Sequence, residues 1–280
     1  GYPQAQVADV LAKRFKALEM RSDRAVGVNM YPNMTEEPLE RREEDTPKLK
    51  KEREAAVAAY VADIDTNYLA GKLAAVETVE GTIEAFSNGA TIGQVAAASC
   101  KAEAPETVEA IAAHHWTERY EALRFDTEDY VKKTGKNVEV FLCNMGPIPQ
   151  HKARADFSTS FLQVGEFNVH LNNGFQDDEG KPGSRYEKCV EALKAGIDEN
   201  GTPYDVAVIC STDATYPEDV PALAPMIKAA NPNITLFLAG AAPKDLEPVY
   251  KEAGVDDFIS VKANCFQTLK MLQKKKGMIE

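Results

Sequence analysis

Apolar residues near the start of the chain recur with a helical period. Val7, Val10, Leu11, Phe15 and Leu18 follow one another at steps of three and four residues, with polar residues between most of them. Because an α-helix completes a turn in about 3.6 residues, this spacing puts the five side chains on one face. The pattern therefore predicts an amphipathic helix.

The apolar stripe stops near Val26 and Gly27, and a segment rich in helix-breaking residues follows. Residues 27–33 read Gly-Val-Asn-Met-Tyr-Pro-Asn, and Pro38 comes soon after them. Proline fixes its own φ and restricts the preceding residue, so two prolines and a glycine this close together disfavour helix. We predict an extended connector here.

Helical patterns resume and continue to about residue 136. Residues 40–54 carry a dense mixture of charges, which is typical of a solvated helix face with local ion pairs. Thr46 and Pro47 match an N-cap followed by proline at the first helical position. We predict a helix over 72–86 that is stopped by Ser87-Asn88-Gly89, and a second helix that is capped by Thr91. A third helix is predicted over 105–130. The helical region as a whole ends at Lys133-Thr-Gly-Lys136.

From residue 137 the period changes to short β-prone runs. We predict strands at 138–143, 206–210 and 234–239, with weaker candidates at 167–171 and 257–261. Helical patterns follow or separate them at 151–164, 184–197, 217–230, 244–253 and 263–275. Five alternating strand–helix units predict an α/β fold with a doubly wound parallel sheet. Ligands of such sheets bind beyond the carboxyl ends of the strands, here the loops 144–150, 172–183, 211–216 and 240–243.

Composition narrows the class of protein. The 280 residues are 44% hydrophobic and 27% charged, which is typical of a globular chain, and the net charge of −12 argues against a dedicated nucleic-acid binder. No apolar run is long enough to span a membrane. The five cysteines are widely spaced and form no Cys-x-x-Cys, so we expect reduced thiols and a cytoplasmic location. Because residue 1 is Gly rather than Met, we expect a piece of a longer protein.

The loop after the first predicted strand does not suit a nucleotide. Residues 143–151 read Cys-Asn-Met-Gly-Pro-Ile-Pro-Gln-His, with one glycine and two prolines. A phosphate cradle needs several backbone N–H groups and close approach of the backbone, which glycines give and prolines remove. His151, at the predicted helix start, is placed either as a ligand or general base or as an ordinary helix-start residue.

Other chemistry-bearing residues do not assemble into a catalytic set. The adjacent His114 and His115 point to different helix faces, and His170 has no acidic or cysteine neighbour in sequence. Cys210 and Ser211 end a strand without the close glycines of a nucleophile elbow. Residues 177–179 (Asp-Asp-Glu) fit a hard-cation site or, beside Gly-Lys-Pro-Gly, a polar surface turn.

Several segments, taken in order, resemble the methylmalonyl-CoA mutase family. They are residues 27–33, Asn88-Gly-Ala-Thr-Ile-Gly93, Tyr120-Glu-Ala-Leu-Arg124 and the five-unit sheet region. The resemblance covers essentially the whole chain and is greatest to the C-terminal part of the family's small (β) subunit. It implies a barrel-exit helix, an extended linker and a helical region over 1–135, and a flavodoxin-like, cobalamin-binding-type domain over 136–280. The family's barrel would precede residue 1.

The family's main cofactor motif is altered in this chain. Active members carry Asp-x-His-x-x-Gly after the first sheet strand, where the histidine ligates the cobalt of cobalamin and the aspartate orients the histidine. Alignment through Met145-Gly146 puts Ile148 at the aspartate, Gln150 at the histidine and Ala153 at the glycine. His151 comes one residue late, which is about 100° around a helix.

The other two cofactor motifs are altered as well. The family's Ser-x-Leu after the third strand becomes Cys210-Ser-Thr212, and its Gly-Gly after the fourth becomes Ala239-Gly240. The resemblance thus implies a small subunit with no catalytic residue, no metal and no bound cofactor. It would pair as a heterodimer with a catalytic large subunit that carries adenosylcobalamin and interconverts methylmalonyl-CoA and succinyl-CoA in propionate metabolism.

We expect the linker residues Tyr31, Pro32 and Asn33 to contact that partner, with Tyr31 either an aromatic anchor or packed within its own chain.

The sequence leaves two alternative functions open. The chain could be a working adenosylcobalamin-binding module with His151 as a displaced ligand. It could also be an unrelated flavodoxin-like binding module, although no pair of acidic residues follows the first strand as in a receiver domain.

Overall fold

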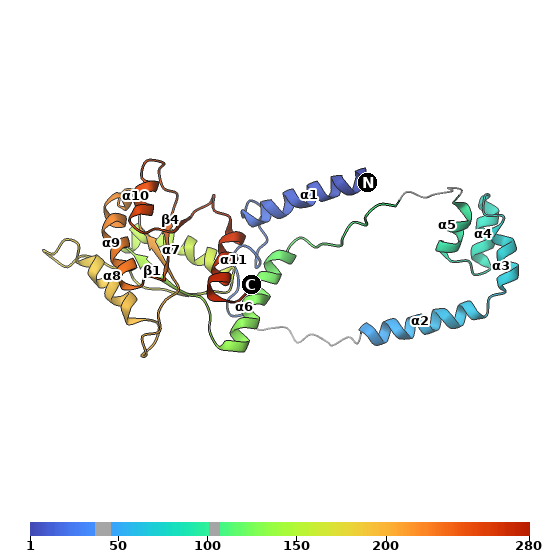
Figure 1. The fold of residues 1–280 in the computed structure, drawn as a ribbon, viewed down its shortest axis with the longest axis horizontal. Helices are drawn as coiled ribbons and strands as arrows, with labels where there is room; N and C mark the ends of the chain where they lie inside the picture. The colour runs from blue at the N-terminus through green and yellow to red at the C-terminus, as the bar shows by residue number, and fades with distance from the viewer. Residues whose placement is uncertain (37–45, 101–106) are drawn as a thin grey trace. The chain divides into compact units, whose positions relative to one another are not determined.

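The computed structural model describes residues 1–36, 46–100 and 107–280, which divide into two compact units (Figure 1). The sheet unit comprises residues 1–36 and 110–280, and the helical unit lies within residues 37–109. Our expectations for residues 37–45 and 101–106 lie outside the described residues. The predicted boundary between residues 135 and 136 falls inside the sheet unit, at the end of a helix, and stays a prediction.

The sheet unit is built on five parallel strands, as the alternating pattern predicted. The order across the sheet is β2-β1-β3-β4-β5, with every neighbouring pair parallel. The strands are β1 (Glu139–Asn144), β2 (Asn168–His170), β3 (Val206–Cys210), β4 (Thr235–Ala239) and β5 (Asp257–Ile259). β1 and β3 are buried along their whole length, which explains why they read as near-continuous apolar runs.

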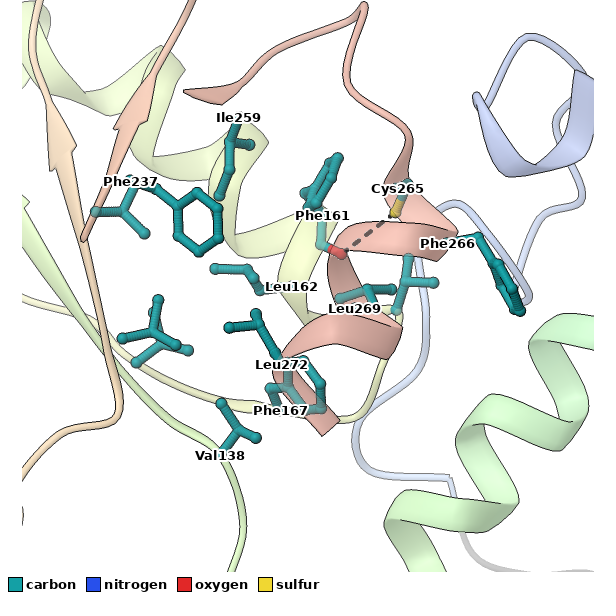
Figure 2. Packing of buried hydrophobic residues seen from close by; sticks show 14 of the residues in the cluster. Val138, Phe161, Leu162, Phe167, Phe237, Ile259, Cys265, Phe266, Leu269 and Leu272 are labelled. Atoms are coloured by element: carbon teal, nitrogen blue, oxygen red, sulfur yellow. Dashed lines mark hydrogen bonds between the residues drawn. The ribbon is translucent and has the colours of Figure 1, made fainter. Parts of the chain in front are cut away.

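Helices cover both faces of the sheet and create two cores. They are α7 (Ile148–Gln163), α8 (Ser184–Ala195), α9 (Tyr216–Ala230), α10 (Glu247–Glu252) and α11 (Cys265–Lys276). α7 and α11 pack on one face and α8, α9 and α10 on the other (Figure 1). Successive strand residues alternate between the cores, so Leu142 joins the first and Phe141 the second. Figure 2 shows the first core, where Phe161, Leu162 and Leu272 meet the sheet.

Helix α1 (Tyr2–Glu19) forms as predicted, but of the apolar face only Phe15 and Leu18 are buried, whereas Val7 and Val10 are exposed. The connector predicted at 27–33 is wrong in part, because residues 25–30 form a closed turn. Gly27 N–H donates to Met30 O at 2.7 Å, and the buried Asn29 side chain accepts from Ala25 N–H and donates to Leu18 O. The side-chain amide thus replaces the backbone partners that a turn leaves unpaired.

Helix α6 (Glu118–Thr134) begins later than the predicted 105. Residues 107–115 are irregular, and the Glu118 carboxylate accepts a hydrogen bond from His115 N–H at the start of the helix. The helix ends at Thr134, four residues beyond the predicted 130 but within the segment 133–136 that we predicted to end the helical region, and Gly135 takes the left-handed conformation with φ 68°.

The helical unit contains α2 (Thr46–Ala62), α3 (Thr66–Leu73), α4 (Val79–Ser87) and α5 (Ile92–Ser99). The single helix predicted over 72–86 is in fact two, because Thr78 caps α4 by accepting from Gly81 N–H at 3.0 Å. The predicted Thr91 cap is confirmed and forms a reciprocal capping box with Gln94. The described side chains of α2 are exposed, as expected of a charged helix face.

Candidate functional site at the carboxyl edge of the sheet

The carboxyl ends of β1 and β3 define the place where a ligand would be expected. The strand order reverses between these two neighbours, so the loop after β1 leads to α7 on one face and the loop after β3 leads to α9 on the other. Such a switch point normally leaves a crevice. The residues that surround it decide whether the crevice can admit a ligand.

The loop after β1 is held close to the sheet. Met145 is buried, Met145 N–H donates to Cys210 O at 2.9 Å, and Gly146 N–H donates to Phe175 O at 2.9 Å. Gly146 has φ 78°, and a Cβ there would lie 1.8 Å from Gln150 Oε1. The Gln150 side chain is therefore folded back over this glycine.

The three positions aligned with the main cofactor motif lie at the start of α7. Ile148 is the first helical residue and is 51% exposed, Ala153 is also exposed, and Gln150 is partly buried. None of these side chains is an imidazole, a thiolate or a carboxylate, which are the usual side-chain ligands of transition metals. As a set they do not fit a group that needs a ligand to cobalt.

His151 is buried rather than presented to a ligand. Only 3% of the residue is exposed, and its Nδ1 lies 3.1 Å from Gly146 O. A Cβ on Gly174 would lie 2.4 Å from the ring Cε1, so the imidazole packs against the loop after β2. This is how a helix-start histidine with a backbone partner is accommodated in a core.

The ends of β3 and β4 are joined by a tyrosine that sequence reasoning missed. Tyr216 OH donates to Ala239 O at 2.5 Å and accepts from Ser211 N–H at 3.1 Å. Tyr216 is 4% exposed, and burial raises its pKa well above the ordinary value, with the Cys210 thiol a smaller cause. The phenol is therefore a neutral structural bridge at physiological pH.

An ion pair lies over the end of β4. Arg154 of α7 donates from Nη2 to Asp213 Oδ1 at 2.7 Å. Gly240 has φ 138°, and a Cβ there would lie 3.2 Å from Arg154 Nη1 and 3.5 Å from Asp213 Oδ1. The space above this glycine is thus occupied by the guanidinium of the chain itself.

The remaining predicted positions on the edge are packed into the sheet. Cys210 and Ala239 are fully buried, and Thr212 is partly buried. Burial raises the pKa of the Cys210 thiol, and the nearby Cys143 raises it further, so no thiolate nucleophile forms there. The structure thus brings the seven motif positions to one edge of the sheet.

The predicted partner-contact residues lie just beyond the closed turn. Tyr31 is 65% exposed and has a positive φ of 51°, Pro32 is partly buried, and Asn33 is exposed. Asn33 Oδ1 accepts from Thr35 N–H and Thr35 Oγ1. An exposed aromatic ring on a short turn is available to a second chain.

One histidine has an acidic neighbour that the local sequence did not reveal. His170 Nε2 lies 2.6 Å from Glu139 Oε2, because the parallel register places Glu139 beside Asn168 on the neighbouring strand. His114 and His115 each contact a carboxylate of α6, namely Glu118 and Glu121. Within the described residues, no three His, Cys, Asp or Glu side chains come together as a metal site would require.

Among the described helices, we find none with both the length and the apolar character needed to cross a bilayer.

Comparison with known proteins finds similarity to methylmalonyl-CoA mutases. Residues 1–104 match the family model described as methylmalonyl-CoA mutase. The chain is 30% identical over 159 residues to the methylmalonyl-CoA mutase small subunit of Porphyromonas gingivalis, which covers 57% of this chain and 22% of that protein. It is 28% identical over 158 residues to the probable methylmalonyl-CoA mutase small subunit of Mycobacterium bovis, which covers 56% of this chain and 23% of that protein.

A longer alignment extends across the sheet region. A methylmalonyl-CoA mutase of Cereibacter sphaeroides is 22% identical over 275 residues, covering 91% of this chain and 36% of that protein. The chain thus matches about a quarter or less of the length of the two small subunits.

Proposed function

We propose that the chain is part of a small subunit of the methylmalonyl-CoA mutase family, which it resembles over residues 1–104, and that this subunit binds no cobalamin and pairs with a catalytic large subunit. The large subunit would carry adenosylcobalamin, and the complex would interconvert methylmalonyl-CoA and succinyl-CoA in propionate metabolism in the cytoplasm. The relatives named as small subunits support the assignment to this subunit type.

The observation that carries the proposal is that the carboxyl edge is filled by the chain's own side chains. A bound corrinoid needs room beyond the strands for its nucleotide tail and a ligand for cobalt. Arg154 and Asp213 cover Gly240, and Tyr216 bridges the ends of β3 and β4. Ile148 and Gln150 offer neither an orienting carboxylate nor an imidazole.

The buried state of His151 argues against the alternative of a displaced ligand. To reach a cobalt atom, the imidazole would have to leave its contact with Gly146 O and the loop around Gly174. That movement would expose the core beneath α7 and leave the site of the ring empty, at a cost of several kcal/mol on the scale of aromatic deletions.

Pairing with the large subunit is supported by the exposed aromatic next to the closed turn. Tyr31 is held in a left-handed conformation beside residues 25–30, whose backbone is fixed by Asn29. Because the neighbouring backbone is already fixed, only the side chain of Tyr31 would lose conformational entropy when a partner covers it. We assign Tyr31, Pro32 and Asn33 to this contact.

Two measurements test the proposal. The chain, at high concentration, is titrated into hydroxocobalamin and adenosylcobalamin while the visible spectrum is recorded, and unchanged spectra are expected. The tagged large subunit of the same organism is used to capture the chain, and capture is expected to weaken in Tyr31→Ala but not in Tyr2→Ala, a matched exposed tyrosine.

Each outcome separates the hypotheses. A spectral change that disappears in His151→Ala would replace the proposal with a working cobalamin module. Failure of the large subunit to capture the wild-type chain would refute the pairing, whatever the spectra show. If a flavin titrated in the same way changes its visible spectrum on binding the chain, whereas the cobalamins do not, the chain would instead be an unrelated flavodoxin-like module.

A further inference from the structure

A cavity beside α1 has a cationic lining, which is unusual in a chain whose net charge is −12. It measures about 240 Å³ and lies where the end of α1, helix α7 and the loop after β5 meet. Its polar lining consists of the arginines Arg21 and Arg24 and the hydroxyl residues Ser22 and Ser260. No carboxylate lines it in the part of the chain that the structure describes.

Arg21 is held in this cavity by contacts that leave its charge uncompensated. Its Nε donates to Met30 Sδ at 2.9 Å and its Nη2 to Ser160 Oγ at 3.3 Å. The guanidinium also lies over the rings of Phe157 and Phe161, at 5.5 and 5.6 Å from their centroids. Its third nitrogen, Nη1, is buried and has no hydrogen-bond acceptor among the described residues.

This arrangement leaves one donor of Arg21 unused and its charge without an ion-pair partner among the described residues. A guanidinium carries five N–H donors, and a buried donor without an acceptor costs about 1–3 kcal/mol. Arg21 as a residue is partly buried, and Nη1 is the atom of its guanidinium that lacks an acceptor. Arg21 makes no ion pair with a described carboxylate, and its neighbour Glu19 already binds Arg119 at 2.5 Å and Asn264 at 3.2 Å.

The end of helix α1 does not supply the missing partner. The carbonyls that a helix leaves free at its C-terminus could attract a cation. Here they are already used by the backbone, because Arg21 N–H donates to Leu18 O at 3.0 Å and Ser22 N–H donates to Ala17 O at 2.9 Å. The guanidinium instead contacts α7, away from those carbonyls.

The backbone at Arg21 indicates that the side chain, and not the turn, accounts for an arginine here. The two hydrogen bonds just described form a Schellman motif, whose left-handed position is usually glycine. Arg21 occupies that position with φ 56°, a conformation that costs a residue with a Cβ about 1 kcal/mol or more. Glycine would form the same turn without strain, but it would lack the cation.

We propose that this cavity binds a small organic carboxylate with a short aliphatic body. The carboxylate would accept from the Arg21 guanidinium, and Arg24, which also lines the cavity, would favour a negative ligand. The rest of the lining is apolar and includes Met20, Met30 and Phe157, which suits a hydrocarbon tail. A phosphate group would bring its additional charged oxygens against the apolar part of the lining, so we expect it to bind less well. The inference does not depend on the proposed subunit role.

Methionine methyl resonances provide a local probe of binding. The chain, labelled with ¹³C at its methionine methyl groups, is titrated with butyrate at constant ionic strength, and inorganic phosphate is used in a parallel titration. Met20 and Met30 line the cavity, whereas Met145 is buried at the sheet edge and serves as an internal control. Saturable shifts of Met20 and Met30 with butyrate, and weaker ones with phosphate, are expected.

Matched variants connect the shifts to the guanidinium. Arg21→Asn removes the cation but tolerates the left-handed backbone, and it should weaken butyrate binding about ten-fold or more. Arg14→Gln, at an exposed position of α1, should leave binding unchanged. Far-UV circular dichroism verifies that both variants are folded. If Arg21→Asn does not fold, Arg21→Gly takes its place.

The proposal is overturned by any of three results. These are no shift of Met20 or Met30 at any butyrate concentration, the same affinity in the folded Arg21 variant as in wild type, and tighter binding of phosphate than of butyrate. The last result would assign the cavity to a phosphate ligand instead.

Discussion

Arg154 and Asp213, which are 59 residues apart in the chain, form a 2.7 Å ion pair that spans the carboxyl edge of the sheet and covers Gly240. The pair is partly exposed, since the Asp213 side chain is 71% accessible. Its electrostatic contribution to stability is therefore small. Its importance is steric, because the guanidinium occupies the space directly above the glycine.

The bridge made by Tyr216 should be important for stability. Tyr216→Phe removes the hydroxyl that joins Ser211 N–H to Ala239 O and leaves two buried backbone groups without this partner. The free energy of unfolding should fall by about 1–3 kcal/mol. Urea unfolding followed by circular dichroism measures the change, and Tyr31→Phe, at an exposed ring, is the control. An effect no larger than that of the control would show that the hydroxyl is dispensable.

Asn29 should be the most sensitive residue of the turn after α1. Its fully buried amide accepts from Ala25 N–H at 2.8 Å and donates to Leu18 O and Asp23 O at 2.9 Å each. Asn29→Ala should lower the free energy of unfolding by about 3 kcal/mol, because buried groups lose their partners. Asn33→Ala, at an exposed residue nearby, should change it by less than about 0.5 kcal/mol. Equal effects of the two substitutions would contradict the structure.

Thiol reactivity should be confined to the helical unit. Cys100 is exposed, whereas the other four cysteines, Cys143, Cys189, Cys210 and Cys265, are buried. Burial raises the pKa of Cys143 and of Cys265, the latter to about 12, so their reactive thiolates are scarce at pH 8. A disulfide reagent should therefore label one thiol of the native chain rapidly and all five after denaturation. Cys100→Ser should abolish the fast phase, and a fast phase that persists would disprove the assignment.

The acidic surface of α6 should give a defined pH dependence. Partial burial raises the pKa of Glu128 and the Glu166 carboxylate raises it further, so the folded state binds this proton more tightly than the unfolded state. The resulting stabilisation is complete below the unfolded pKa of about 4.3 and disappears as the pH rises through the folded pKa. Glu128→Gln should therefore raise stability relative to wild type more at pH 7 than at pH 3. Thermal unfolding at both values measures this, with Asp126→Asn as the control, and the opposite order would refute the shift.

The features predicted correctly from the sequence are those that depend on local patterns. Residues 206–210 form a strand with the predicted bounds because they are apolar on both faces. Gly135 ends α6 and Thr91 caps α5, since each effect arises within a few neighbouring residues. The doubly wound sheet follows from the alternation of such elements.

The errors come from contacts that a linear pattern does not show. The turn at 25–30 depends on the Asn29 amide reaching Leu18 O, eleven residues away. The Glu139–His170 contact depends on the register of two strands. At the candidate site, the motif positions could be located by alignment, but no spacing rule places Arg154 against Asp213 or Tyr216 against Ala239.

The hydrogen bond between Tyr216 and Ala239 at the end of β4 has a consequence for protein engineering. A histidine introduced at position 150 would add a donor atom to an edge that is still closed by the phenol ring and by Arg154. To make room for a corrinoid, both side chains would first have to be shortened, with the accompanying loss of stability. Only then would an imidazole at position 150 be accessible to a cobalt atom.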